Sequence, residues 1–133
     1  MEPNTYTVEL RVECPQSFAS NVGAWIGLTP IQARALRQQP VEAEPRILLS
    51  FGSISEPGVL SEWPTLEQAF QSILNIVGDR KAEIQLCRGR GDVYWWCANY
   101  QKSFDAATNM SSGLLSSLAN MEVPVVLFNY HSS

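Results

Sequence analysis

Only a few side chains in this 133-residue sequence have the type and spacing that catalysis would need, and His131 is the single histidine among them. A Ser-His or Cys-His nucleophilic site requires a base that the fold holds firmly. A histidine so close to a chain end is poorly placed for that, because chain ends fray. We therefore expect no catalytic residue, and a protein that is not an enzyme.

The three cysteines, Cys14, Cys87 and Cys97, are an odd number and lack the spacing of metal ligands. With one histidine and no cysteine cluster, the sequence does not supply a zinc ligand set. Cysteines of this kind act as small apolar fillers under reducing conditions. We predict three free thiols, neither a metal nor a cofactor, and a cytoplasmic location.

A glycine-rich segment, Arg88-Gly89-Arg90-Gly91-Asp92, has two functional interpretations that fail. A phosphate-binding loop would need a following helix to present amide donors. An adhesion tripeptide would need secretion, and Met1–Tyr6 lacks the basic and apolar regions of a secretory signal. We interpret the segment as the turn of a β-hairpin that joins strands at Lys81–Arg88 and Asp92–Tyr100.

Acidic residues give a different kind of candidate. The formal net charge is −4 and the sequence pI about 4.9, which disfavours nucleic acid and favours a basic partner. No apolar run approaches the ~18 residues of a membrane span. Four glutamates lie in or beside predicted loops and would form an acidic surface, the alternative being that each is a solvated loop charge: Glu42, Glu44, Glu56 and Glu62.

The aromatic segment Asp92–Tyr100 organises the predicted fold. Alternation along a strand puts Trp96 on one face and Trp95 on the other, so both faces carry a large aromatic. We predict an interior strand with one face against helices and the other partly open, where a partner would bind around Trp95. The alternative is that both tryptophans simply fill the core.

The remaining elements follow from periodicity and end signals. Strands are predicted at Thr5–Cys14, at Arg46–Phe51 and, in a central position, at Val123–Tyr130. Helices are predicted from Pro15 to Ile26, at Ile31–Gln38, from Thr65 to Val77, and after a cap at Asn109 or Ser111. A long loop, Gly52–Glu62, leads to Trp63 and is a candidate functional segment.

This succession predicts a single α+β domain over residues 1–133. Its sheet should be antiparallel or mixed, with about five strands and with helices packed on one face. A ferredoxin-like variant is the expected topology.

Several short motifs, taken together, resemble the sequence pattern of a known family. They are the turn Gly27-Leu28-Thr29-Pro30, Trp63 ahead of the main helix, and the segment Met110–Met121 followed by a strand ending at Tyr130. The pattern, over roughly residues 5–130, is similar to an uncharacterised bacterial domain-of-unknown-function family whose members occur as immunity proteins of polymorphic and contact-dependent toxin systems. The chain departs from it at Gln38-Gln39-Pro40, where a basic or glycine stretch usually follows. The family has no established catalytic residues to carry over.

The resemblance and the acidic balance together predict an immunity protein that binds and neutralises a cognate, basic antibacterial toxin by direct contact. The expected partner-binding residues are Glu42, Glu44, Glu56, Glu62, Trp63 and Trp95. The alternative is a small-molecule-binding or regulatory α+β domain with a pocket between sheet and helices. A small enzyme that works through Glu and Tyr is a third hypothesis. The oligomeric state stays open.

Overall fold

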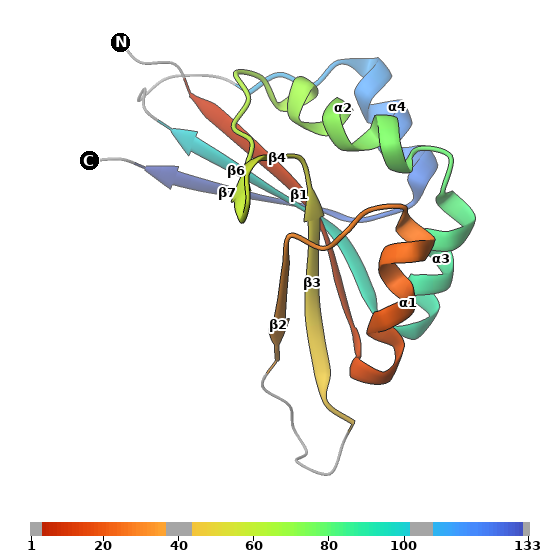
Figure 1. Ribbon diagram of the computed structural model, residues 1–133. Coiled ribbons are helices and arrows are strands. Elements are labelled where there is room, and N and C mark those ends of the chain that lie inside the picture. The colour runs from red at the N-terminus through yellow and green to blue at the C-terminus, as the bar shows by residue number, and fades with distance from the viewer. Residues whose placement is uncertain (1–3, 37–43, 102–107, 132–133) are drawn as a thin grey trace.

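The computed structural model describes residues 4–36, 44–101 and 108–131, which form a layer of helices against a twisted β-sheet (Figure 1). The five-stranded sheet has the order β2-β3-β1-β6-β7, and a separate two-stranded hairpin pairs β4 with β5. The strands are β1 (Thr5–Pro15), β2 (Gln32–Ala35), β3 (Arg46–Gly52), β4 (Ile54–Glu56), β5 (Val59–Leu60), β6 (Asp92–Gln101) and β7 (Val125–His131). The helices are α1 (Gln16–Ile26), α2 (Leu66–Val77), α3 (Lys81–Arg90) and α4 (Ser112–Met121).

The sheet is mixed. β1 lies at its centre and pairs antiparallel with β3 and β6, while β7 is parallel to β6. Leaving out the small hairpin, β1 to β6 follow a β-α-β-β-α-α-β succession, which is the ferredoxin-like pattern with two helices, α2 and α3, where that fold has one; β7 is added at the edge. The predicted α+β class, with a mixed five-stranded sheet and helices on one face, is confirmed.

The helices form where the sequence supplies caps and apolar stripes. The Thr65 hydroxyl accepts a hydrogen bond of 3.1 Å from the Gln68 amide at the start of α2, and Ser111 caps α4 in the same way. Gly27 ends α1 with a φ of 84°, a left-handed conformation that glycine adopts without steric cost. The helices bury their apolar faces on alternate side chains of the central strands, Val8, Leu10 and Val12 of β1 among them.

Two local predictions are wrong. Residues 81–90 form α3 instead of a hairpin strand, because Ile84 and Cys87, one helical turn apart, are the buried residues, while Leu86 is 56% exposed. The apparent alternation of Ala82, Ile84 and Leu86 is therefore not a strand pattern. The predicted helix at Ile31–Gln38 is replaced in its described part by β2, which pairs with β3.

The end of the chain also differs from expectation. The predicted strand Val123–Tyr130 corresponds to β7, which begins only after Pro124 and lies at the edge of the sheet instead of the centre. An apolar strand need not be covered on both faces, and β7 is exposed on both. The predicted loop Gly52–Glu62 contains the small β4–β5 hairpin.

Candidate binding site on the open face of the sheet

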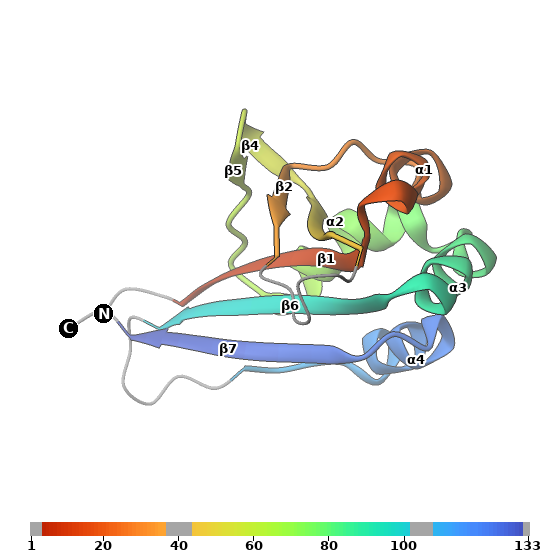
Figure 2. The same ribbon diagram turned by 90° about the horizontal axis from the view of Figure 1, so that it is seen from below.

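No helix of the described residues lies on one face of the five-stranded sheet (Figure 2), and we call this the open face. In Figures 1 and 2 all four helices of the described chain lie on the other side of the sheet. The polar half of β1 points to the open face, through Thr7, Glu9, Arg11 and Glu13. Register with β1 places Tyr94 and Trp96 of β6 on the same face.

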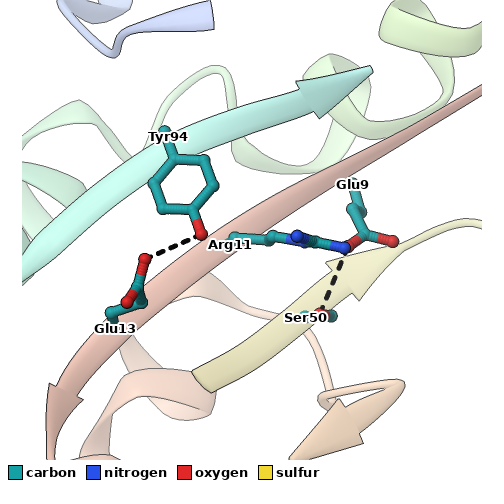
Figure 3. A network of polar contacts seen from close by, with 5 residues as sticks. All are labelled: Glu9, Arg11, Glu13, Ser50 and Tyr94. Carbon is teal, nitrogen blue, oxygen red and sulfur yellow. Dashed lines mark hydrogen bonds and ion pairs between the residues drawn. The ribbon is translucent and has the colours of Figure 1, made fainter. Parts of the chain in front are cut away.

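A polar network crosses the centre of the open face (Figure 3). Arg11 forms an ion pair with Glu9, and the Ser50 hydroxyl donates to the same carboxylate at 3.4 Å. The Arg11 guanidinium also lies 4.2 Å from the centre of the Trp96 ring, a distance suited to a cation–π interaction. Glu9 is only 7% exposed, and these partners offset the cost of burying its charge.

A second pair adjoins this network. The Tyr94 hydroxyl donates a hydrogen bond of 2.8 Å to Glu13 Oε2. Burial, followed by the hydrogen bond and the charge of Glu13, raises the pKa of Tyr94, and Arg11 only partly opposes the shift. The phenol therefore stays protonated at neutral pH and acts as a donor. The structure thus brings together a Glu–Tyr pair that the sequence spacing did not reveal.

The β4–β5 hairpin stands beside the open face and creates a recess of about 770 Å³. Thr7, Glu9 and Ser50, all buried, contribute the sheet side of the recess, and the hairpin contributes the opposite wall. Glu62 and Tyr100 also line it. Thr5 Oγ1 donates to Glu62 Oε1 at 2.8 Å, which orients that carboxylate.

Aromatic rings continue the open face from β6 onto β7. Tyr100 stacks on Tyr130 with ring centroids 5.3 Å apart, and Phe128 lies 5.1 Å from Tyr130. These three rings are 37–45% exposed. Large aromatics with one free side are the residues that dominate binding energy in protein interfaces.

The predicted acidic residues do not form one surface. Glu62 lines the recess and Glu56 is exposed on β4, so these two share the hairpin region. Glu44 is exposed at the other end of β3, where it accepts a hydrogen bond of 3.3 Å from the Ser17 amide. Glu42 lies outside the described residues.

Neither of the two tryptophans predicted to bind a partner is an exposed anchor residue. Trp63 is half-buried against the core, and its backbone exchanges two hydrogen bonds of 2.8 Å with Tyr6. The prediction that Trp95 faces an exposed surface is wrong. Trp95 is 0% exposed and packs edge-to-face on Phe70 of α2, with ring centroids 5.5 Å apart.

The sequence did not decide the facing of β6. Both faces combine a tryptophan with apolar and polar residues, and the Trp95 face carries the polar side chain of Asn99. The wet half of the β1 alternation indicated an exposed polar face, although not which polar residues would meet. Glu9, Arg11 and Glu13 were therefore missed as site residues.

Among the described residues, no three His, Cys, Asp or Glu side chains gather closely enough to hold a metal ion. No helix in the same part of the chain is both long and apolar enough to cross a membrane. Comparisons of the chain with protein-family models, curated proteins and solved structures find no match.

Proposed function

We propose that this chain is a cytoplasmic immunity protein that neutralises a cognate antibacterial toxin by direct contact, and that the toxin docks on the open face at the recess. The observation that carries the proposal is the recess of about 770 Å³ on the open face, which no helix of the described part of the chain covers, with Glu62 and Tyr100 at its border. Loops and hairpins held by a rigid sheet are common positions for binding residues. The family resemblance of the sequence supports the same function.

Charge supports a basic partner. The chain carries a net charge of −4, and Glu9 inside the recess is already paired with Arg11. Glu56 and Glu62 are exposed and form no ion pair with a described residue. These two carboxylates would therefore steer a basic toxin toward the hairpin.

An exposed ring is placed to anchor the same partner. Tyr100 borders the recess, is 37% exposed and rests on Tyr130, which limits its rotation. A tyrosine held in this way loses little conformational freedom on binding. We assign to Tyr100 the anchoring role that the sequence suggested for Trp95.

The proposed mode of action is non-catalytic. The Tyr94–Glu13 pair on the open face keeps its tyrosine protonated, since burial and Glu13 raise the pKa of Tyr94. A tyrosine that acts as a general base would need the opposite shift. In our proposal the pair fixes the floor of the docking face.

The proposal is tested by replacing Tyr100. The toxin is first captured from the native strain with immobilised wild-type protein, and it is then produced separately for kinetics. Tyr100→Ala should speed dissociation about tenfold or more, the effect expected of an interface anchor. The matched control is Ile76→Ala, because Ile76 is 43% exposed on α2, on the helix side of the sheet. Equal dissociation rates for the Tyr100 and Ile76 variants would contradict docking at the recess.

A second candidate function, binding of a small molecule, is favoured by the volume of the recess. About 770 Å³ lies within the usual range for ligand sites, roughly 300–1,000 Å³. From the sequence we expected a ligand pocket between the sheet and the helices, whereas this recess lies on the open face of the sheet, away from the helices. Native mass spectrometry of protein purified from its own strain separates the candidates: a stoichiometric bound small molecule would favour ligand binding, and ligand-free protein favours toxin docking.

A further inference from the structure

We infer that β7 is the interface of a symmetric dimer, in which the β7 strands of two copies of this chain pair antiparallel, edge to edge. β7 occupies the end of the sheet order and hydrogen-bonds to β6 on one side. Among the described residues, no strand pairs with its other side. Figure 2 shows β7 as the outermost strand, with α4 near its start instead of over its length.

Along that outer edge, the backbone groups of β7 pair with no other strand of the described residues. The Trp95 amide donates to the Pro124 carbonyl at 2.8 Å. Because backbone groups alternate sides along a strand, Phe128 directs its amide and carbonyl toward β6, and Leu127 and Asn129 direct theirs outward. The outer edge is therefore a ready template for another strand.

The side chains of β7 lack the features that protect edge strands. Val125, Leu127 and Phe128 are each 44–45% exposed, on both faces of the sheet. From Val125 to Tyr130 there is no charged residue and no proline. The opposite edge, β2, is only four residues long and carries Arg34. Short, charged edges resist pairing, and long apolar edges invite it.

Charge identifies the occupant as a second copy. A basic partner would gain nothing from a strand without carboxylates. Two chains that each carry −4 repel one another elsewhere, so a neutral segment such as Val125–Tyr130 is where they can meet. The toxin-docking charges, Glu56 and Glu62, lie on the hairpin instead.

The area is modest but sufficient for a weak dimer. With roughly 150–250 Å² for a fully open aromatic side chain and less for Val and Leu, the part-exposed side chains of Val125–Tyr130 offer on the order of 400 Å² per chain. A symmetric pair would then bury at most about 800 Å², the size of a weak interface, so backbone hydrogen bonds between the two edges supply much of the affinity.

Symmetry fixes the register. In an antiparallel pair, residues that lie directly opposite each other point to the same face of the sheet. In a symmetric pair of identical strands this requires that the twofold axis passes through one residue and its copy, and not between two residues. Full overlap of Val125–His131 puts that position at Phe128. Leu127 and Asn129 of opposite copies then exchange amide–carbonyl hydrogen bonds, and the two Phe128 side chains face each other in a pair without hydrogen bonds, where side chains approach closely.

This pairing has a structural consequence. An axis perpendicular to the sheet joins the two five-stranded sheets into one, with all helices on the same side. The open faces become continuous, and their two recesses lie on one surface. A dimer of this kind offers two docking sites to its partners.

The test measures molar mass by analytical ultracentrifugation and pairing by cross-linking. Wild-type protein at about 100 µM, where even a dimer with a micromolar Kd is populated, should sediment as a dimer. Leu127→Pro, which removes an outward amide but no bond to β6, and Phe128→Lys should both be monomers. Leu115→Lys is the matched control, because Leu115 is 49% exposed on α4, and it should stay dimeric.

Cross-linking tests the register independently of any loss of stability. With diamide as oxidant, two Phe128→Cys thiols should form an intermolecular disulfide, whereas Val126→Cys, which would face Tyr130 of the second copy, should not. Circular dichroism confirms that each variant is folded. A monomeric wild type would overturn the inference, and so would a dimer that survives Phe128→Lys or that cross-links through Val126→Cys and not Phe128→Cys.

Discussion

The Trp96 indole stacks on the Phe128 ring across the parallel β6–β7 ladder, with ring centroids 5.3 Å apart and an interplanar angle of 23°. The Arg11 guanidinium contacts the same indole at 4.2 Å. Trp96 therefore connects the polar centre of the open face to the exposed rings of β7. Its neighbour Trp95 points to the opposite side of the sheet and is fully buried.

The two adjacent tryptophans should differ sharply in their contribution to stability. Trp95→Ala removes a fully buried indole from the core and should cost about 3–5 kcal/mol. Trp96→Ala removes a half-buried ring that contacts Arg11 and Phe128 on the open face and is not part of the core, so we expect a smaller loss, about 1–2 kcal/mol. Urea unfolding of both variants measures the difference. Equal losses would mean that the open face is as densely packed as the helix side.

Two glycines of the Arg88–Asp92 segment give a second matched pair. A Cβ on Gly91 would lie 2.0 Å from the Glu13 carbonyl oxygen, where β1 meets the start of β6, whereas a Cβ on Gly89 meets no atom within 4 Å. Gly91→Ala should destabilise by at least about 2 kcal/mol because backbone must move. Gly89→Ala should stabilise α3 by about 0.5–1 kcal/mol. A melting temperature of the Gly91→Ala variant equal to or higher than that of the Gly89→Ala variant would contradict this packing.

Stability should fall at alkaline pH because of the buried thiols. Burial, and to a lesser extent the charge of Glu9, raises the pKa of Cys97 to about 12, from a usual value of 9.0. Between pH 9 and about 12 the unfolded chain releases this proton and the folded chain does not, so stability is lost as the pH rises. Urea midpoints should therefore decrease from pH 8 to pH 10.5.

Cys97→Ala provides the control for that pH dependence. The variant is less stable at every pH, but its midpoint should fall less steeply above pH 9. An unchanged slope would show that Cys97 ionises in the folded state. Cys87, whose pKa burial raises to about 11, and Cys14 contribute in the same direction. All three are free and buried, so thiol titration should find three groups after unfolding and slow reaction before it.

Charge reversal at the hairpin should act on association. Each Glu→Lys change adds two charges, so Glu56→Lys with Glu62→Lys moves the net charge from −4 to 0. The rate of association with a basic toxin should fall about tenfold at low salt and become less salt-dependent. The control is Asp79→Lys with Glu83→Lys, an equal change on the helix side. Identical association rates for the two double variants would exclude local steering by the hairpin.

The strong periodic elements were predictable from the sequence. The alternation of Thr5–Cys14 and the capped stripe from Thr65 to Val77 both gave the correct structure, because each pattern extends over ten or more residues and has one solution. The structure of residues 81–90 was not predictable. Ile84 and Leu86 have the spacing of a strand, and only packing against the core shows that Ile84 and Cys87 are buried while Leu86 is exposed.

The candidate site was predictable only in part. The sequence indicated a partly open sheet face, a long functional loop at Gly52–Glu62 and acidic residues in or beside loops, of which Glu56 and Glu62 both lie in the hairpin region. It did not indicate the facing of Trp95, because both faces of β6 are aromatic. It also could not bring Glu13 and Tyr94 together, since they are 81 positions apart and meet only through β1–β6 pairing.

The most direct measurement of the central proposal is neutralisation of a captured toxin. Basic proteins retained from the native strain by the wild-type chain are each expressed in a susceptible host, alone and with the chain. We predict that one of them arrests growth, that the wild-type chain relieves the arrest, and that the variant combining Glu56→Lys, Glu62→Lys and Tyr100→Ala relieves it far less than the Asp79→Lys, Glu83→Lys control. Relief of the arrest to the same degree by both variants, or the absence of any toxic protein among those retained, would contradict the account.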